Sequence, residues 1–346
     1  MSNFIYSKMD GTNDPVFGKF EHPIKALIEN ESNACEKRES VLKTLYNVEK
    51  SNRYAETIMG QTDFDIFQSS REGQGAENDN VETTFKKTIE HVKFMKEFTI
   101  TREMADDSKF GIGADVKRLP KNFVRAYYKT RVQLAAWALI NGTKSEGTFA
   151  NAKIDLTCQD GLSLFNKAHK YSSEKMKKVT ASNYFYGDLC STPAKLEEAL
   201  GVLANKIRNF KDENGETNEY IADYIIIPCN RPKLETMVKK VVGSERTVGS
   251  DHNDINTQYG NWTVVVLPNW TTEDDRFMVM SSEANENLMG NMFYNRVPLD
   301  ITSDVDKHTR NYFWNGYCRF GVGFNSWRHI ALAVNSSAEV SGATAL

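Results

Sequence analysis

The sequence predicts an α+β fold, because three regions of the chain show three different patterns of apolar residues. Residues 119–141 have the apolar period of one long helix, and residues 57–100 have the alternation of a long β-hairpin. Residues 222–282 alternate short apolar strands with a helix. Together these patterns indicate a chain in which an extended part and a separate α/β lobe share one fold.

The composition is that of a folded protein without a strong charge bias. The 346 residues are 40% hydrophobic and carry a formal net charge of −3, which argues against a general nucleic-acid binder with a basic stripe. No stretch approaches the ~20 apolar residues that span a bilayer, and the start MSNFIYSKMDGTNDP lacks the pattern of a signal peptide. Five widely spaced cysteines without a CxxC pair predict free thiols in a reducing cytoplasm.

The first 50 residues predict an arm with little core of its own. Residues 1–23 are polar and irregular, with several glycines and prolines, so an extended segment is expected. Residues 24–50 are rich in charge and helical in period, with Val41, Leu45 and Val48 on one face. Because that apolar stripe is thin, the helix needs a partner surface.

The hairpin predicted over residues 57–100 is too long to be stable by itself. One arm contains DFDIF (Asp63 to Phe67), the tip spans Arg71 to Asn80, and the returning arm alternates until its phase changes near His91. The phase change suggests a bulge, or a strand that passes from one neighbour to another. Since a two-stranded ribbon is at best marginal in water, another subunit is expected to support it.

The charges of the hairpin leave two interpretations open. Acidic residues lie on one arm and basic residues on the other: Asp63, Asp65, Lys86, Lys87, Lys93 and Lys96. They can form a solvated face with weak cross-strand pairs. They can also be complementary in charge to a neighbouring subunit.

The rest of the chain predicts a buried helix and an α/β lobe. Pro120 suits a first helical position, Asn141-Gly142 a stop, and the segment LAAWALI a deeply buried helix end. The lobe would contain helices over residues 193–210 and 231–243. Its strands would lie near residues 222–228, 261–268 and 276–282, and the aromatic- and glycine-rich end of the chain would form strands that return to an earlier core.

No motif in the chain predicts catalysis, a metal or a cofactor. Residues 250–256 match only the start of a calcium loop, and the six histidines form no ligand cluster. Cys158 and His169 are eleven residues apart and could meet in space as a nucleophile and a base. The favoured interpretation is structural: a strand or loop that enters a short packed helix, with Leu162, Leu164 and Phe165 as anchors. We therefore expect a protein that is not an enzyme.

Three stretches resemble a known family. They are DGLSLFNKAHKY (residues 160–171), the strand, helix and Asn-Asp-containing loop of residues 223–268, and RFGVGFNSWRH (residues 319–329). In this order they are similar to segments of the major capsid proteins of tailed bacteriophages with the Hong Kong 97-type fold, and in particular to the Mu-like head subunits.

The resemblance implies a division of the chain into named parts. These are an N-terminal arm (1–50), an extended hairpin called the E-loop (51–98), a peripheral domain (99–175 and 301–335) with a spine helix (119–141), an axial domain (176–300) and a C-terminal tail (336–346). It also implies residues that contact other subunits: Asp63, Asp65, Arg71, Glu72, Lys86, Lys87, Lys93, Lys96, Arg246, Asp251, Asn253 and Asp254.

The implied function is that of a major head protein. Its copies would form hexamers and pentamers of an icosahedral shell that encloses double-stranded DNA without sequence-specific binding. Its other partners would be a portal and a separate scaffolding protein, with no membrane and no cofactor. The protein would be assembled in the bacterial host cytoplasm and located in the virion capsid. The alternative is an encapsulin-type shell of a cellular compartment, which shares the fold.

Overall fold

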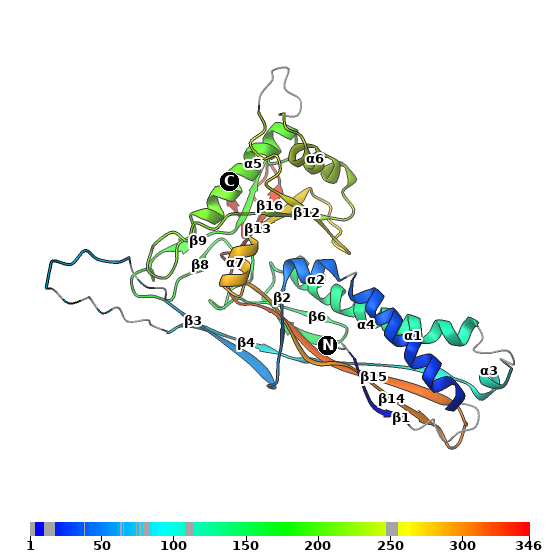
Figure 1. The fold of residues 1–346 in the computed structure, drawn as a ribbon. Helices are drawn as coiled ribbons and strands as arrows, with labels where there is room; N and C mark the ends of the chain where they lie inside the picture. The colour runs from blue at the N-terminus through cyan, green and yellow to red at the C-terminus, as the bar shows by residue number, and fades with distance from the viewer. Residues whose placement is uncertain are drawn as a thin grey trace.

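The computed structural model describes residues 4–9, 18–37, 39–62, 64, 66–73, 75, 78, 83–107, 114–246 and 255–346. Figure 1 shows an elongated lower part, a roughly triangular upper part and a hairpin that projects sideways from their junction. Each of the two larger parts is built on its own β-sheet.

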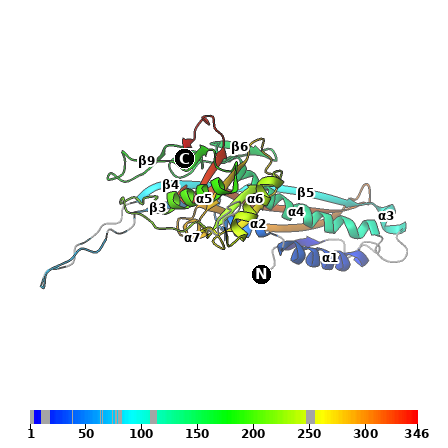
Figure 2. The ribbon, with the colours of Figure 1, turned by 90° about the horizontal axis from the view of Figure 1, so that it is seen from above.

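The lower part is a sheet covered by helices. Its strand order is β1-β14-β15-β5, with β2 also paired to β14. The long helix α4 (Ala114–Ile140) lies along it, α1 packs on α4, and α2 lies at the end of α1 (Figure 2). The bounds are β1 Phe4–Met9, α1 Gly18–Glu36, α2 Ser40–Leu45, β2 Asn47–Lys50, β5 Val92–Ile100, β14 Asn291–Val305 and β15 Tyr312–Phe324.

Aromatic side chains and one glycine hold α4 against this sheet. Phe98 of β5 stacks on Trp314 of β15, and its ring centroid lies 5.0 Å from that of Phe123 on α4. A Cβ atom at Gly316 would lie 2.3 Å from the Phe123 ring, so only glycine lets the helix approach β15 this closely.

The upper part is a mixed sheet with two helices on it. Its order is β12-β11-β13-β16-β10-β17, in which β11 and β12 are parallel. Helix α5 begins at Pro193 after the Thr192 cap, and it buries Leu196, Leu200 and Leu203. The bounds are β10 Tyr184–Gly187, α5 Pro193–Arg208, β11 Tyr224–Pro228, α6 Pro232–Gly243, β12 Thr263–Leu267, β13 Arg276–Met280, β16 Ile330–Asn335 and β17 Thr344–Ala345.

Small elements complete the fold. Three antiparallel pairs, β3–β4, β6–β7 and β8–β9, lie outside the two sheets. The bounds are β3 Ala55–Gln61, β4 Thr83–Glu90, α3 Arg102–Asp107, β6 Glu146–Phe149, β7 Ala152–Asp155, β8 His169–Lys170, β9 Thr180–Ala181 and α7 Ser282–Asn287. Strand β3 pairs with β4, whereas β5, one residue further on, pairs with β15. Of the two alternatives for the phase change at His91, the structure therefore shows a strand that passes from one neighbour to another.

The α+β class, the long helix and the α/β lobe are confirmed, and four details differ from expectation. The long helix begins at Ala114, so Pro120 does not open it but lies inside its second turn, where the proline leaves out one helical backbone hydrogen bond. Residues 1–23 include strand β1, and residues 24–50 hold parts of two helices and then β2, which gains stability from β14. The short helix expected after Asp160 is absent, because polar side chains bind the backbone of that loop instead.

The path of the chain between the two sheets also bears on the expected domain limits. The limit at residue 300 falls inside β14, all of which belongs to the lower sheet. Strand β16 lies in the upper sheet, although residues 301–335 were assigned to the peripheral domain. The division into named parts stays a proposal. The chain crosses between the two parts in residues 141–183, at α7 and in the segment before β16.

Candidate functional site

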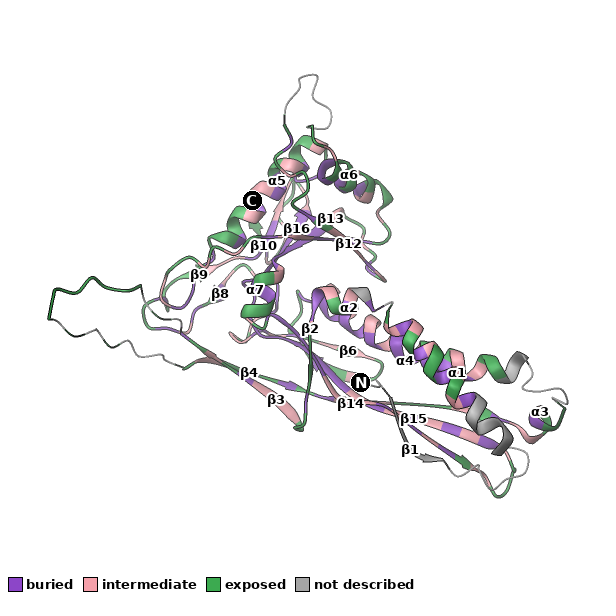
Figure 3. Ribbon diagram, viewed as in Figure 1, coloured by how far each residue is buried: buried purple, intermediate pink, exposed green. Residues whose placement is uncertain are grey.

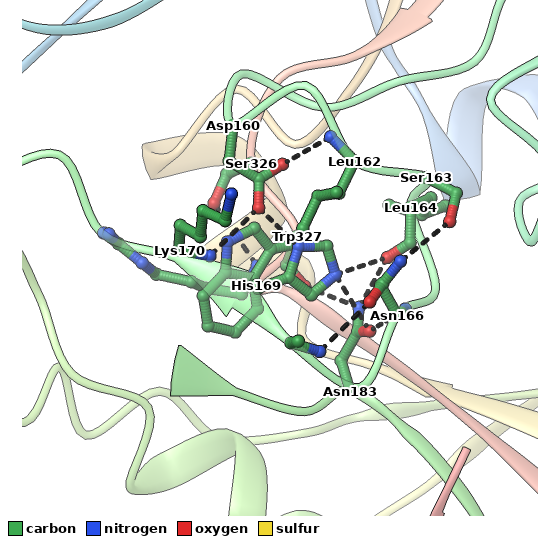
Figure 4. A network of polar contacts seen from close by, with 12 residues as sticks. Asp160, Leu162, Ser163, Leu164, Asn166, His169, Lys170, Asn183, Ser326 and Trp327 are labelled. Atoms are coloured by element: carbon green, nitrogen blue, oxygen red, sulfur yellow. Dashed lines mark hydrogen bonds and ion pairs between the residues drawn. The ribbon is translucent and has the colours of Figure 1, made fainter. Parts of the chain in front are cut away.

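The Cys158–His169 pair is not a catalytic arrangement. The His169 imidazole lies at the centre of a polar network (Figure 4), where its Nδ1 atom is 2.7 Å from Oδ2 of Asp160. Its Nε2 atom lies 3.2 Å from both the Leu164 carbonyl oxygen and Oδ1 of Asn183. Oxygen acceptors thus face both ring nitrogens, so neither nitrogen is available to take a proton from a thiol.

The titration of the neighbouring groups agrees with this structural role. Burial raises the pKa of the Cys158 thiol well above its ordinary value, so the sulfur stays protonated and is a poor nucleophile. Burial would also raise the pKa of Asp160, but the hydrogen bond and charge of His169 outweigh it, and the pKa of Asp160 is lowered. Asp160 is therefore a carboxylate that accepts hydrogen bonds inside the fold.

The network joins the 158–170 loop to the upper sheet. The His169 ring stacks on Trp327, with centroids 4.5 Å apart and planes 8° apart. The Asn183 amide donates to the carbonyl oxygens of Leu164 and Ile330, at 2.7 Å and 3.2 Å. His169, Asn183 and Trp327 are buried, so breaking these contacts would leave unpaired polar groups in the interior.

Two buried ion pairs fasten other segments. Arg328 pairs with Glu213, and the second oxygen of this carboxylate accepts hydrogen bonds from the backbone N–H groups of Ser172 and Ser173. Arg131 of α4 lies 3.2 Å from Glu39, just before α2, and both side chains are almost fully buried. The sequence did not reveal these pairs, because no local pattern links residues so far apart.

The base of the hairpin is held firmly on the body of the subunit. Ile58 and Ile89 form a small separate core with Met292 and Tyr294 of β14. Lys87 is buried, and its Nζ atom donates to Oδ2 of Asp155 at 2.6 Å and to Oγ1 of Thr157 at 2.8 Å.

Two glycines of β15 allow the base of the hairpin to pack closely against this strand. A Cβ atom at Gly321 would lie 2.6 Å from the Glu90 carbonyl oxygen, and one at Gly323 would lie 2.7 Å from the Ile89 side chain. The glycines of the F-G-V-G-F segment therefore let β4 cross β15 at close range. The close approach of β4 explains why this segment contains glycine at both positions.

Beyond its base, the hairpin projects away from the body (Figures 1 and 2) and carries apolar side chains in solvent. Figure 3 shows the described residues of this projection as mostly exposed. Phe64, Ile66 and Phe67 are 71%, 67% and 105% exposed. Exposed apolar patches of this kind are typical of surfaces that bind other proteins.

The residues predicted to contact other subunits lie in separate regions. Arg71 and Glu72 are exposed near the hairpin tip, Lys86 is exposed on β4, and Lys93 and Lys96 are exposed on β5. Lys87 instead points into its own subunit. Arg246 is exposed and forms a β-bridge with Ile255. The other five predicted residues fall outside the described part of the chain: Asp63, Asp65, Asp251, Asn253 and Asp254.

No metal site or membrane helix is found within the described ranges. No group of three or more His, Cys, Asp or Glu side chains there could hold an ion. None of the helices described is long and apolar enough to cross a bilayer. Most of the calcium-like stretch at residues 250–256 lies outside those ranges.

Comparison with known proteins agrees with the fold. A family model described as phage capsid protein matches residues 85–333, well over half of the chain. A solved structure from Mycobacterium phage Patience aligns with 98% of this chain and 94% of its own, at 11% identity and a TM-score of 0.51. No curated protein matches the chain.

Two further solved structures show the same likeness. The capsid of the cyanophage P-SCSP1u aligns over 86% of this chain and 88% of its own, at 8% identity and a TM-score of 0.50. The capsid of the native GTA particle aligns over 86% and 90%, at 13% identity and a TM-score of 0.50. At such identities the likeness concerns the fold, which is the capsid fold that the sequence predicted.

Proposed function

The chain belongs to the phage capsid protein family, and we propose that it is the major capsid protein of a tailed phage, whose copies associate as pentamers and hexamers of an icosahedral shell. The observation that carries the finer proposal is the projecting hairpin with Phe64, Ile66 and Phe67 in solvent. In the shell, this E-loop would lie on a second copy of the chain.

The free energy of burying the hairpin supports this arrangement. Each large apolar side chain contributes about 1.5–3 kcal/mol when it passes from water into a protein contact. Three such side chains on every subunit would therefore stabilise each contact by several kcal/mol. The firm base of the hairpin, on Lys87, Ile89 and the β15 glycines, would hold the projection in the orientation that the neighbour needs.

The geometry of the contact favours rings. A hairpin on one side of a subunit that docks on a different surface of the next makes a heterologous contact, and such contacts close into rings when the rotation allows. Pentamers and hexamers are rings of this kind. We propose that Arg71 and Glu72 of the hairpin and Lys86 of β4, which are exposed, take part in this contact.

The proposed partners follow from a closed shell around a genome. They are other copies of this chain, a portal, a separate scaffolding protein and the enclosed double-stranded DNA, with assembly in the bacterial host cytoplasm. We also propose that the protein is not an enzyme. The occupied nitrogens of His169 and the protonated Cys158 thiol support this for the one catalytic pair that the sequence offered.

Replacing the hairpin anchors tests the proposal. We expect the Phe64→Ser/Ile66→Ser/Phe67→Ser variant to fold with an unchanged thermal midpoint but to sediment as small species, while the wild type forms large particles. The matched control is Val179→Ser/Ile221→Ser/Met289→Ser, which removes exposed apolar side chains elsewhere and should leave assembly intact. Normal particles from the hairpin variant would refute the proposed contact.

A further inference from the structure

Helix α4 carries a row of basic side chains on its outer surface. Lys117, Lys121, Arg125 and Lys129 follow one another at intervals of four residues, and Arg118 lies beside the first of them. Lys117, Arg118, Arg125 and Lys129 are exposed, and Lys121 is half-buried. At 100° per residue all five fall within an arc of about 120°. We call these five residues the basic stripe.

The stripe differs from an ordinary solvated helix face. Two other helices contain charges of opposite sign four residues apart that pair, Glu235–Lys239 on α6 and Arg102–Asp106 on α3. In the stripe, successive charges four residues apart all have the same sign, which disfavours an isolated helix. Arg125 pairs with Glu31 of α1, whereas no ion pair within the described residues involves Lys117, Lys121 or Lys129.

The spacing of the stripe fits an extended polyanion. With a rise of 1.5 Å per residue, its charges recur about every 6 Å along roughly 18 Å of helix. A compact anion would meet one or two of these charges, but a phosphate backbone presents negative charge along its whole length. Three of the five residues are lysines, which act as point charges without the planar fork that reads base edges, and Arg125 is already paired with Glu31. The stripe therefore suits binding without sequence preference.

We propose that the basic stripe of α4 contacts the phosphate backbone of double-stranded DNA, and that the face of the subunit formed by α1 and α4 lines the interior of the shell. This inference rests on the proposed function, because only a shell that encloses DNA brings the polymer to that face. It also refines the interpretation of the net charge. A chain with a net charge of −3 can still carry a local stripe, and the other charges limit how tightly DNA is held.

The test measures DNA binding by the full chain kept below its assembly concentration. A fluorescent 30-base-pair duplex is titrated at 50–200 mM salt with the wild type, with Lys117→Gln/Lys121→Gln/Lys129→Gln, and with Lys178→Gln/Lys233→Gln/Lys240→Gln. The last variant is matched in net charge and removes exposed lysines from other elements. Thermal unfolding and electron microscopy of each protein report folding and shell formation.

We expect the stripe variant to bind at least tenfold more weakly than the wild type at 100 mM salt. The slope of log affinity against log salt should become shallower by about 2.7, or 0.9 for each lost phosphate contact. The control variant should stay within twofold of the wild type.

Equal losses in both variants, or no binding by the wild type at 50 mM salt, would overturn the inference. A folded stripe variant that no longer forms shells would also overturn it, because the stripe would then face another subunit. Shells without DNA binding contradict only this inference, whereas DNA binding without shells contradicts only the proposed function.

Discussion

The Nζ atom of Lys87 lies 2.6 Å from Oδ2 of Asp155, and this ion pair ties strand β4 of the hairpin to strand β7 of the body. Burial alone would raise the pKa of Asp155, but hydrogen bonds from Lys87 and Thr157 outweigh it and lower the pKa. The Lys87 side chain is 5% exposed and that of Asp155 is 59% exposed. If the pair is broken, water can therefore hydrate the Asp155 carboxylate but not the Lys87 ammonium group.

Replacing Lys87 with methionine should loosen the hairpin base. We expect a loss of about 1 kcal/mol in the free energy of unfolding, since Asp155 can still be hydrated. Amide hydrogen exchange in β4 should become faster than in the wild type, whereas exchange in β15 should stay the same. The neighbouring exposed lysine gives the control, because Lys86→Met should change stability by less than about 0.5 kcal/mol. Equal effects of the two substitutions would show that the ion pair does not hold the hairpin.

An alanine at Gly321 should displace β4 from β15. The new Cβ atom would lie 2.6 Å from the backbone oxygen of Glu90, which cannot turn aside as a flexible side chain could. Overpacking of this kind costs about 1–3 kcal/mol. Gly243 has open space around its Cβ position, so Gly243→Ala is the matched control and should not lower the thermal midpoint. A Gly321→Ala variant with the same stability as the wild type would refute the proposed close packing of β4 on β15.

The stability of the subunit should depend on His329 in mildly acidic solution. Burial lowers the pKa of His329 to about 3, below its ordinary value of 6.5. Between pH 6.5 and about 3, His329 is therefore protonated in the unfolded chain but neutral in the folded chain. Stability falls as the pH falls from about 6.5 towards 3, with a slope of up to about 1.4 kcal/mol per pH unit from this residue.

Urea unfolding at several pH values checks this dependence. The difference between the wild type and His329→Gln should change with that slope, because both proteins share their carboxylates. A difference that stays constant between pH 6.5 and 4 would contradict the neutral, buried state of His329.

Of the five thiols, Cys229 should react first with a disulfide reagent. Cys229 is exposed, whereas Cys35, Cys158, Cys190 and Cys318 are buried. Burial raises the pKa of Cys190 and of Cys318 to about 12, so these thiols stay protonated at neutral pH. We expect one thiol of each chain to react quickly and the other four to react only when the chain unfolds. A fast phase that survives Cys229→Ser would show that a buried thiol is accessible.

The parts of the fold that follow from a local pattern were predictable. The apolar periods located α4, α5 and β11, and the phase change at His91 located the point where the chain leaves β3 and joins β15. The exposed tip also followed from sequence, because a two-stranded hairpin has no core of its own.

The contacts between distant segments were not predictable in the same way. The sequence favours a structural role for the segment that contains His169, but the stacking of His169 on Trp327 and its bond to Asn183 depend on how the two sheets pack. Lys87 belongs to a set of lysines that look alike in the sequence, and only the position of Asp155 makes it a buried partner. The net charge of the chain gave no indication of the basic stripe. Whether the basic residues of α4 form one exposed surface depends on which face of the helix the other elements leave uncovered.

Electron microscopy of the purified full chain tests most directly whether the hairpin joins neighbouring subunits into a shell. We expect closed icosahedral shells in which density for the hairpin of each subunit lies on its neighbour, with DNA inside particles made in the host. Open tubes, flat rings or dispersed monomers under all conditions would contradict it, and so would closed shells in which every hairpin lies on its own subunit.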